Sequence, residues 1–167
     1  MSTISPNIIS MEIRFIEPEE KEKIKALFIR EWKSDVMVSR EKKHQIEDLE
    51  TIIALENEKI EGILTFHTMG NQVEIVSLDS FDEGKGIGTT LLDFTLNHFK
   101  SMKLDRIWLI TSNDNCHAMR FYQKRGWKMV NIHFNAIEEA RKIKPEIPLI
   151  GYDGIPILHE IEFEYSL

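Results

Sequence analysis

Residues 83–92 read EGKGIGTTLL, and the rest of the chain can be placed outwards from them. The alternating run 73–78 before them predicts a strand, and apolar residues at helical spacing after them predict a helix. A glycine-rich turn at a helix start leaves backbone N–H groups free at the positive end of the helix dipole. We therefore expect an anion site, above all for a phosphate or pyrophosphate, which Gly84, Gly86 and Gly88 let approach the main chain closely.

Two well-known phosphate loops do not match this turn. A P-loop needs GxxxxGK followed by Ser or Thr, whereas Gly84-Lys85 is followed by Gly86 and no glycine lies five residues earlier. The dinucleotide fingerprint GxGxxG also differs, because the spacing here is GxGxG. Taken alone, the turn could equally join a strand to a helix without binding anything.

A second segment supports the anion site. Residues 106–111 predict a strand, and residues 115–127 predict a short helix directly after it. Asn113 or Asn115 can cap the start of this helix, and Gly126 can end it.

Together the two segments resemble the GNAT superfamily of acyl-CoA-dependent N-acetyltransferases. The family loop Q/R-x-x-G-x-G/A is similar to residues 83–88, and Glu83 stands where the family has Gln or Arg. We expect the loop backbone, rather than that carboxylate, to contact the pyrophosphate. The family pattern N-x-x-A-x-x-x-Y-x-K-x-G-F/W is met by Asn115, Ala118, Tyr122, Lys124, Gly126 and Trp127.

The resemblance implies an α/β fold with a mixed, mostly antiparallel central sheet, helices on both sides and splayed central strands. It also implies acetyl-CoA as co-substrate and direct transfer of the acetyl group, in a ternary complex, to a primary amine of a small molecule or peptide. The residues expected to bind the cofactor are Leu78, Asp79, Glu83, Gly84, Lys85, Gly86, Ile87, Gly88, Thr89, Asn115 and Tyr122. A non-catalytic acyl-CoA-binding or sensor domain is the alternative, and a nucleotide-binding module is a weaker one.

Acetyl transfer to an amine needs a base and an acid. An alkylamine has a pKa near about 10.4 and must lose a proton, while the departing thiolate benefits from a proton donor. The resemblance assigns the donor to Tyr122, whose phenol stays protonated at neutral pH; a purely structural aromatic is the alternative. Glu74 is the expected base, because it lies on the same strand face as Leu78. A solvated strand carboxylate, or Asp79 as base, stays open.

Length, composition and net charge limit the number of domains, the location and the partners that can be expected. The chain has 167 residues and suits one domain, residues 11–167, behind a flexible lead-in of residues 1–10. We expect a cytoplasmic protein, because the chain shows neither a membrane span nor a secretory signal and has one cysteine. A net charge of −7 argues against nucleic-acid binding and is compatible with cationic amines.

The remaining segments are less specific. The other predicted elements are a strand over 11–16, a helix over 17–30, a hairpin over 51–56 and 60–67, a strand over 128–133, a helix over 136–142 capped by Asn135, and a closing strand over 160–165. Residues 32–50 are ambiguous, and a second short helix is one interpretation. In the closing strand, Glu160, Glu162 and Glu164 predict an exposed face.

No metal site is expected. His67, His117, His133 and His159 lack a metal-binding spacing, and Cys116 is predicted to be small and partly buried rather than a nucleophile.

Residues 135–159 form an insertion longer than the family's minimal hairpin. Its proline-rich loop displays Tyr152 and Asp153, which suit recognition of a cationic amine beside the acceptor site. Packing on the sheet, or support of a homodimer, is the alternative role of this loop. The acceptor itself stays open among polyamines, amino acids, aminoglycosides, peptide N-termini and lysine.

Overall fold

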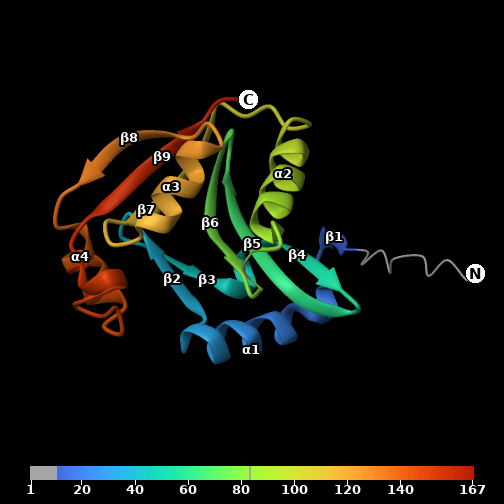
Figure 1. The fold of residues 1–167 in the computed structure, drawn as a ribbon, viewed down its shortest axis with the longest axis horizontal. Helices are drawn as coiled ribbons and strands as arrows, with labels where there is room; N and C mark the ends of the chain where they lie inside the picture. Colours follow the sequence, from blue (N-terminus) through green and yellow to red (C-terminus); the bar gives the residue numbers. More distant parts are fainter. Residues whose placement is uncertain (1–10, 83) are drawn as a thin grey trace, which may run out of the picture.

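One seven-stranded sheet forms the centre of the molecule, and helices cover both of its faces (Figure 1). The computed structural model describes residues 11–82 and 84–167, so the expected lead-in 1–10 and Glu83 lie outside the described residues. The strands are β1 (Met11–Phe15), β4 (Glu50–Glu56), β5 (Lys59–Met69), β6 (Gln72–Ser80), β7 (Arg106–Ser112), β8 (Lys128–His133) and β9 (Glu160–Tyr165). Their order is β1-β4-β5-β6-β7-β9-β8, with β6 and β7 parallel and all other neighbours antiparallel. This mixed, mostly antiparallel sheet confirms the predicted fold class.

Helices and a small hairpin complete the fold. The α-helices are α1 (Lys21–Trp32), α2 (Ile87–Phe99), α3 (Cys116–Lys124) and α4 (Ala136–Ile143), with 3-10 turns at Pro18–Glu20 (η1), Ile46–Asp48 (η2) and Tyr152–Gly154 (η3). A separate two-stranded sheet contains β2 (Val36–Ser39) and β3 (Lys42–Gln45). None of the helices in the described part of the chain is long and apolar enough to cross a membrane.

Strand β4 shows why the sheet is covered on both faces. Ile52 and Ala54 join the apolar cluster formed with α2, whereas Ile53 and Leu55 join the cluster formed with α1. A strand buried on both faces has a continuous apolar run rather than an alternating one. Gly62 on β5 brings α2 close, because a Cβ there would lie 2.6 Å from Cγ2 of Ile87.

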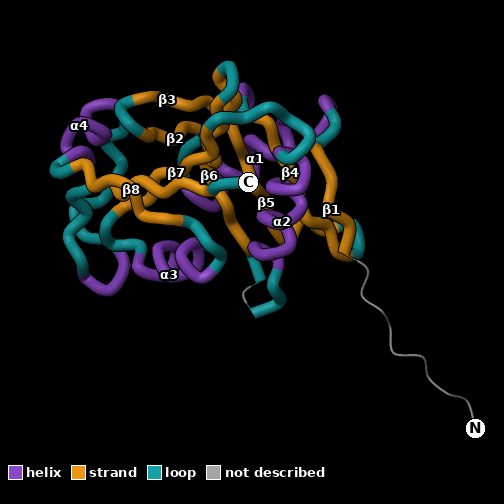
Figure 2. Tube along the Cα trace, turned by 90° about the horizontal axis from the view of Figure 1, so that it is seen from above, coloured by secondary structure: helices purple, strands orange, loops and turns teal. Residues whose placement is uncertain are grey.

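The two central strands separate at their carboxyl ends. Parallel pairing joins Gln72–Ile75 of β6 to Arg106–Leu109 of β7 and stops there. Beyond that point β6 stays paired with β5 as far as Ser80, and β7 stays paired with β9 as far as Ser112. The predicted splay is thus present, and Figure 2 shows the β2–β3 hairpin on one side of these strands and α3 on the other.

Residues 32–50 form no second α-helix, because β2 and β3 pair as a hairpin over most of that range and only the one-turn 3-10 helix η2 follows it. The two-residue turn of the hairpin consists of Arg40 and Glu41, whose φ angles are +48° and +64°. Tight hairpin turns of this kind favour Asn and Gly, which adopt positive φ at little cost. The residue types Arg and Glu do not indicate such a turn, so the hairpin could not be predicted from the sequence.

The acidic side chains of β9 do not form the exposed face that alternation predicts. Glu160 is 2% exposed and accepts hydrogen bonds from the backbone and side chain of Arg40, at 3.1 and 3.0 Å. Glu162 pairs with Arg106 at 2.6 Å, and Arg106 also pairs with Glu164. Two arginines that lie far away in the sequence thus pair with the three acidic side chains of this strand.

The cap predicted for α4 is also absent. Asn135 has a left-handed backbone (φ +58°) and makes no side-chain cap bond. Instead, its backbone N–H donates to Nδ1 of His159 at 2.9 Å.

Candidate active site

Two cavities meet where β6 and β7 separate. We call the first, of about 1100 Å³, the loop cavity, because Gly84, Gly86, Gly88 and Thr89 line it. The second, of about 340 Å³, we call the inner cavity; residues of α1, β2, β7 and α4 line it. The residues that line both cavities are Trp32, Leu78, Asp79, Asn115, Ala118 and Tyr122. A ligand in one cavity can therefore reach a ligand in the other.

The glycine loop has the backbone that an anion site needs. Gly84 and Gly86 have φ angles of +86° and +71°, which side-chain-bearing residues rarely adopt. A Cβ built on either would meet no atom within 4 Å, so the main chain is open to an approaching group. Gly86 is the N-cap of α2, whose first-turn N–H groups and dipole favour negative charge.

Lys85 and Ile87 contribute differently from the glycines. The Lys85 ammonium lies 2.7 Å from Asp82 and 3.5 Å from Glu56, and its pKa is raised, chiefly by the hydrogen bond to Asp82. Lys85 lines neither cavity, so its expected place among the cofactor-binding residues has no support from its side chain. The side chain of Ile87 is buried in the core below the loop.

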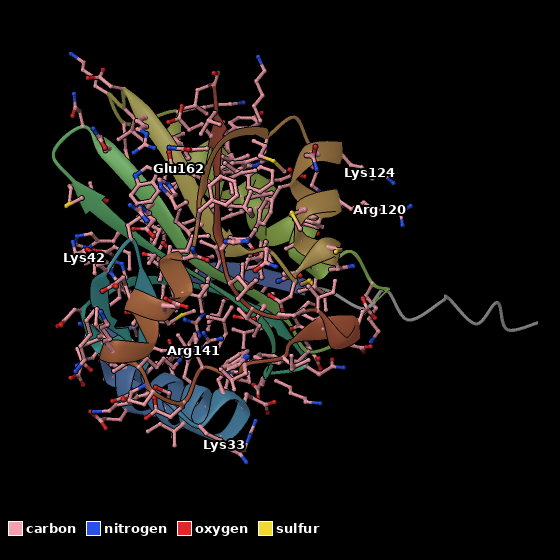
Figure 3. All side chains as sticks on the ribbon, turned by 90° about the vertical axis from the view of Figure 1, so that its left-hand side faces the viewer. Lys33, Lys42, Arg120, Lys124, Arg141 and Glu162 are labelled. Carbon is pink, nitrogen blue, oxygen red and sulfur yellow. The ribbon has the colours of Figure 1, made fainter. Side chains whose placement is uncertain are left out.

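Arg125, which the sequence analysis did not single out, supplies a cation to the loop cavity. Its Nε and one terminal nitrogen donate to Oγ1 of Thr89 at 3.1 and 2.6 Å, and its guanidinium lies 3.7 Å from the centre of the Phe121 ring. Arg120 and Lys124, which lie on α3 just before Arg125, extend outwards (Figure 3). The only sequence feature that could have pointed to Arg125 was its position in the family pattern of residues 115–127, where it occupies the unspecified place before Gly126.

Tyr122 lies at the junction of the cavities. Its ring is 7% exposed and packs against Phe121, Trp127 and Phe163, with ring centres 5.2, 5.4 and 6.2 Å apart. Burial raises the pKa of Tyr122 above its ordinary value, and the nearby charge of Asp79 raises it further. The phenol therefore holds its proton at neutral pH.

Asp79 lies at the same junction, one residue before the end of β6. Burial raises the pKa of its carboxyl from 3.8 to about 7. A carboxyl with this pKa can exchange a proton near neutral pH, as general acid–base catalysis requires. The sequence analysis treated Asp79 mainly as a cofactor-binding residue and as a second choice of base.

Glu74 lies behind the cavity wall rather than on it. It is 3% exposed, accepts a hydrogen bond from the Ser39 hydroxyl, and lies 3.5 Å from Nε2 of His44. Neither cavity includes Glu74 among its lining residues, whereas Ser39 lines the inner cavity. The expected projection of Glu74 into the cleft is thus not observed.

Asn115 does cap α3, as predicted, because its side chain accepts the Ala118 N–H at 3.0 Å. Cys116 beside it is exposed rather than partly buried.

The loop after α4 borders the two cavities unequally. Tyr152 lines the loop cavity, and Asp153 lines neither cavity. Lys144 and Ile147 line the inner cavity instead. Asp114 holds the loop by accepting the Tyr152 N–H at 3.1 Å.

Metal ligation has no support in the described residues. No group of three or more His, Cys, Asp or Glu side chains among residues 11–82 and 84–167 could hold a metal ion.

Known proteins resemble this chain in both sequence and fold. The model of the Acetyltransferase (GNAT) family matches residues 14–127. A Bacillus subtilis (strain 168) relative, named uncharacterized protein YxbD, is 40% identical over 142 residues, or 84% of this chain and 89% of the relative. The solved IAA acetyltransferase from Bacillus cereus ATCC 14579 has a TM-score of 0.74 and 22% identity, covering 95% of this chain and all (100%) of that one.

A GNAT family acetyltransferase from Elizabethkingia anophelis, solved with acetyl-CoA bound, has a TM-score of 0.69 and 17% identity, covering 94% and 98% of the two chains. At these identities the structural likeness establishes the fold. The family model, which covers most of the chain, establishes more: the protein belongs to the GNAT acetyltransferase family, a family of enzymes.

Proposed function

We propose that the protein transfers the acetyl group of acetyl-CoA to a primary amine by direct transfer in a ternary complex. The observation that carries this proposal is the junction of two cavities at Tyr122 and Asp79, with an anion-binding loop on one side only. Such an arrangement brings two substrates together and lets one group pass directly between them. Proximity of this kind supplies a large part of the rate enhancement in bimolecular reactions.

The loop cavity fits coenzyme A. The open backbone of Gly84 and Gly86, the N-terminus of α2 and the Arg125 guanidinium all favour a pyrophosphate. Leu78 at the end of β6 and Asn115 at the start of α3 continue this wall to the junction. When bound, acetyl-CoA supplies the acetyl group as an activated thioester.

Tyr122 is the proposed general acid. Its buried phenol remains protonated and faces both cavities, so it can donate its proton to the sulfur as the carbon–sulfur bond breaks. The packing of its ring against Trp127 and Phe163 fixes the direction of that donation.

Asp79 is the proposed base that first receives the proton of the acceptor amine. It lines both cavities, and its pKa of about 7 leaves a substantial ionised fraction at neutral pH. Glu74, the base expected from the sequence, can act only through the hydroxyl of Ser39, which separates it from the inner cavity. We assign it the supporting role of orienting that hydroxyl.

Release of free thiol from acetyl-CoA tests the proposal. We expect purified protein to bind acetyl-CoA in preference to ATP or NAD by calorimetry, and to release thiol only when a suitable amine is added. Mass spectrometry should show the acceptor heavier by one acetyl group. Tight binding of acetyl-CoA without release, across a panel of amines, amino acids and peptides, would instead identify a non-catalytic sensor domain.

A further inference from the structure

The inner cavity contains a cation whose charge its surroundings do not neutralise. Lys144 follows the last residue of α4 and lines this cavity. Its ammonium donates to the backbone oxygen of Val36 at 2.9 Å, which uses one of three available N–H groups. None of the salt bridges among the described residues involves Lys144, so no carboxylate of that part of the chain lies within ion-pair distance of its ammonium.

The other charged residues of the inner cavity do not compensate Lys144. Glu160 is neutralised by Arg40, which approaches both of its carboxylate oxygens. Asp79 lies at the junction with the loop cavity. Burial lowers the pKa of Lys144, and this effect outweighs the opposing charge of the exposed Glu146.

Most of the residues that line the inner cavity are apolar, and hydroxyl side chains stand among them. The apolar residues are Phe28, Trp32, Val36, Met37, Val38, Ile75, Val76, Leu78, Leu109, Ile110, Ala118, Ile137, Ile147 and Ile157, and the hydroxyl-bearing ones are Ser34, Ser39, Ser77, Thr111, Ser112 and Tyr122. The volume of about 340 Å³ is at the low end for ligand pockets. Arg141 fixes this part of the wall by donating to the backbone oxygens of Pro148 and Ile157, both at 2.8 Å (Figure 3 labels its side chain).

We propose that the acceptor is a single apolar amino acid, or a closely similar amino-carboxylate, whose carboxylate pairs with Lys144 while its amine lies near Asp79. This inference rests on the proposed acetyl transfer and narrows its acceptor. An anion at Lys144 satisfies the remaining N–H groups, and a charge-assisted hydrogen bond in a partly buried site is among the stronger polar contacts. Polyamines and aminoglycosides carry several positive charges and no anion, so Lys144 selects against them.

Acceptor pairs that differ only in the carboxylate test this proposal. L-leucine is compared with isopentylamine and L-phenylalanine with 2-phenylethylamine, with spermidine as a polycation. We expect kcat/KM for at least one amino acid to exceed that for its decarboxylated partner by roughly tenfold or more. Equal or better use of both amines, or of spermidine, overturns the proposal while leaving acetyl transfer established.

Variants at Lys144 separate anion binding from a structural role. Lys144→Met should remove the preference for the carboxylate by raising KM for the amino acid, with KM for acetyl-CoA unchanged, whereas Lys144→Arg should largely keep it. Lys142→Met is the matched control, because Lys142 is exposed in the last turn of α4, two residues before Lys144, and pairs with Glu139 at 2.9 Å. If Lys144→Met lowers the unfolding temperature and leaves the preference intact, Lys144 only ties α4 to β2.

Binding of the reaction products gives an answer that needs no turnover. N-acetyl-L-leucine and N-isopentylacetamide are titrated into the protein saturated with CoA, and into its Lys144→Met variant, by calorimetry. We expect the acid to bind the wild-type protein roughly tenfold more tightly than the amide, and the variant to bind both alike. Equal affinities in the wild-type protein refute the proposal even if no acceptor is acetylated.

Discussion

The loop cavity and the inner cavity are built in different ways. Two local segments, residues 78–89 and 115–125, supply most of the loop cavity, and much of its anion site is backbone. The inner cavity draws on α1, β2, the ends of β6 and β7, and the loop after α4, and its polar groups are largely side chains. A site made of local backbone tolerates sequence change, whereas a site of distant side chains can change its ligand through single substitutions. The fold thus places the proposed cofactor site and the proposed acceptor site on largely different elements.

Tyr122 belongs to both cavities, so its replacement should affect the chemistry rather than either binding step. Tyr122→Phe deletes the proton donor and keeps the ring, and we expect kcat to fall by roughly 10²-fold or more with acetyl-CoA affinity unchanged. Tyr165→Phe, which removes a phenol that lines neither cavity, is the control. A near-normal kcat, measured where chemistry is rate-limiting, would make Tyr122 structural.

Asp79 tests whether the junction also contains the base. Because its ionised form is the active one, kcat/KM of the wild-type protein should rise about tenfold per pH unit below about 7 and level off above it. Asp79→Asn should lose this rise and be roughly tenfold to 10²-fold slower at pH 8, whereas Asp153→Asn should keep the wild-type profile. An unchanged profile in Asp79→Asn would move the base to the Ser39–Glu74 pair.

The pKa of Asp79 also predicts how stability varies with pH. Its folded-state value, about 7, exceeds its ordinary value of 3.8, so the folded protein binds more protons than the unfolded chain between these pH values. The free energy of unfolding should therefore fall as the pH rises from about 4 to about 7, relative to the Asp79→Asn variant. Urea unfolding of both proteins at pH 5 and pH 8 measures this difference.

Gly86 tests the loop cavity alone. Gly86→Val adds a side chain over the backbone that cradles the pyrophosphate, and we expect acetyl-CoA affinity to fall more than tenfold, or about 1.4 kcal/mol. Gly70→Val is a closely matched control, because Gly70 also has a positive φ (+57°) with no atom within 4 Å of its Cβ position, yet it lies in a turn outside both cavities. Similar loss of stability in the two variants, with loss of affinity in Gly86→Val alone, isolates the anion site. Equal affinities would remove the loop from it.

Arg125 should give the smallest effect, because the loop backbone carries most of the anion binding. We expect Arg125→Ala to weaken CoA binding about fivefold, or about 1 kcal/mol, and more at low salt than at high salt. Arg120→Ala, on the outer side of the same helix, should bind CoA like the wild-type protein (Figure 3). A similar loss measured with 3′-dephospho-CoA would assign Arg125 to the pyrophosphate, whereas a loss confined to CoA would assign it to the 3′-phosphate.

Most of the residues that line the loop cavity could be singled out from the sequence, because their signals are local. The glycine spacing, the Asn115 cap and the strands on either side are each visible within a few residues. The hairpin over 51–56 and 60–67 was also predicted, and its turn contains Asn57, which tolerates the observed φ of +50°. The turn at Arg40–Glu41 has similar backbone angles without such a residue, and it was missed.

The inner cavity could not be predicted, because its charges depend on partners far along the chain. Alternation alone placed Glu160 on an exposed face, whereas Arg40, 120 residues away, allows it to be buried. No sequence pattern marks Lys144 as a cavity residue, and nothing distinguishes it from Lys142, two residues earlier. Glu74 was placed on the correct strand, but Ser39 from β2 covers it.

The pairing between β6 and β7 ends at Ile75 and Leu109, so no backbone pairing joins the two halves of the sheet beyond that point. Strands β1, β4, β5 and β6 form one half and β7, β9 and β8 the other, so each half is nearly continuous in sequence. We expect native-state hydrogen exchange to report two cooperative units, with the amides between β6 and β7 exchanging through an opening smaller than global unfolding. A ligand that spans both halves should suppress this opening by mass action. Substrate binding would then hold the two halves of the sheet together, and the hydrogen-exchange protection of the amides between β6 and β7 would measure how strongly it does so.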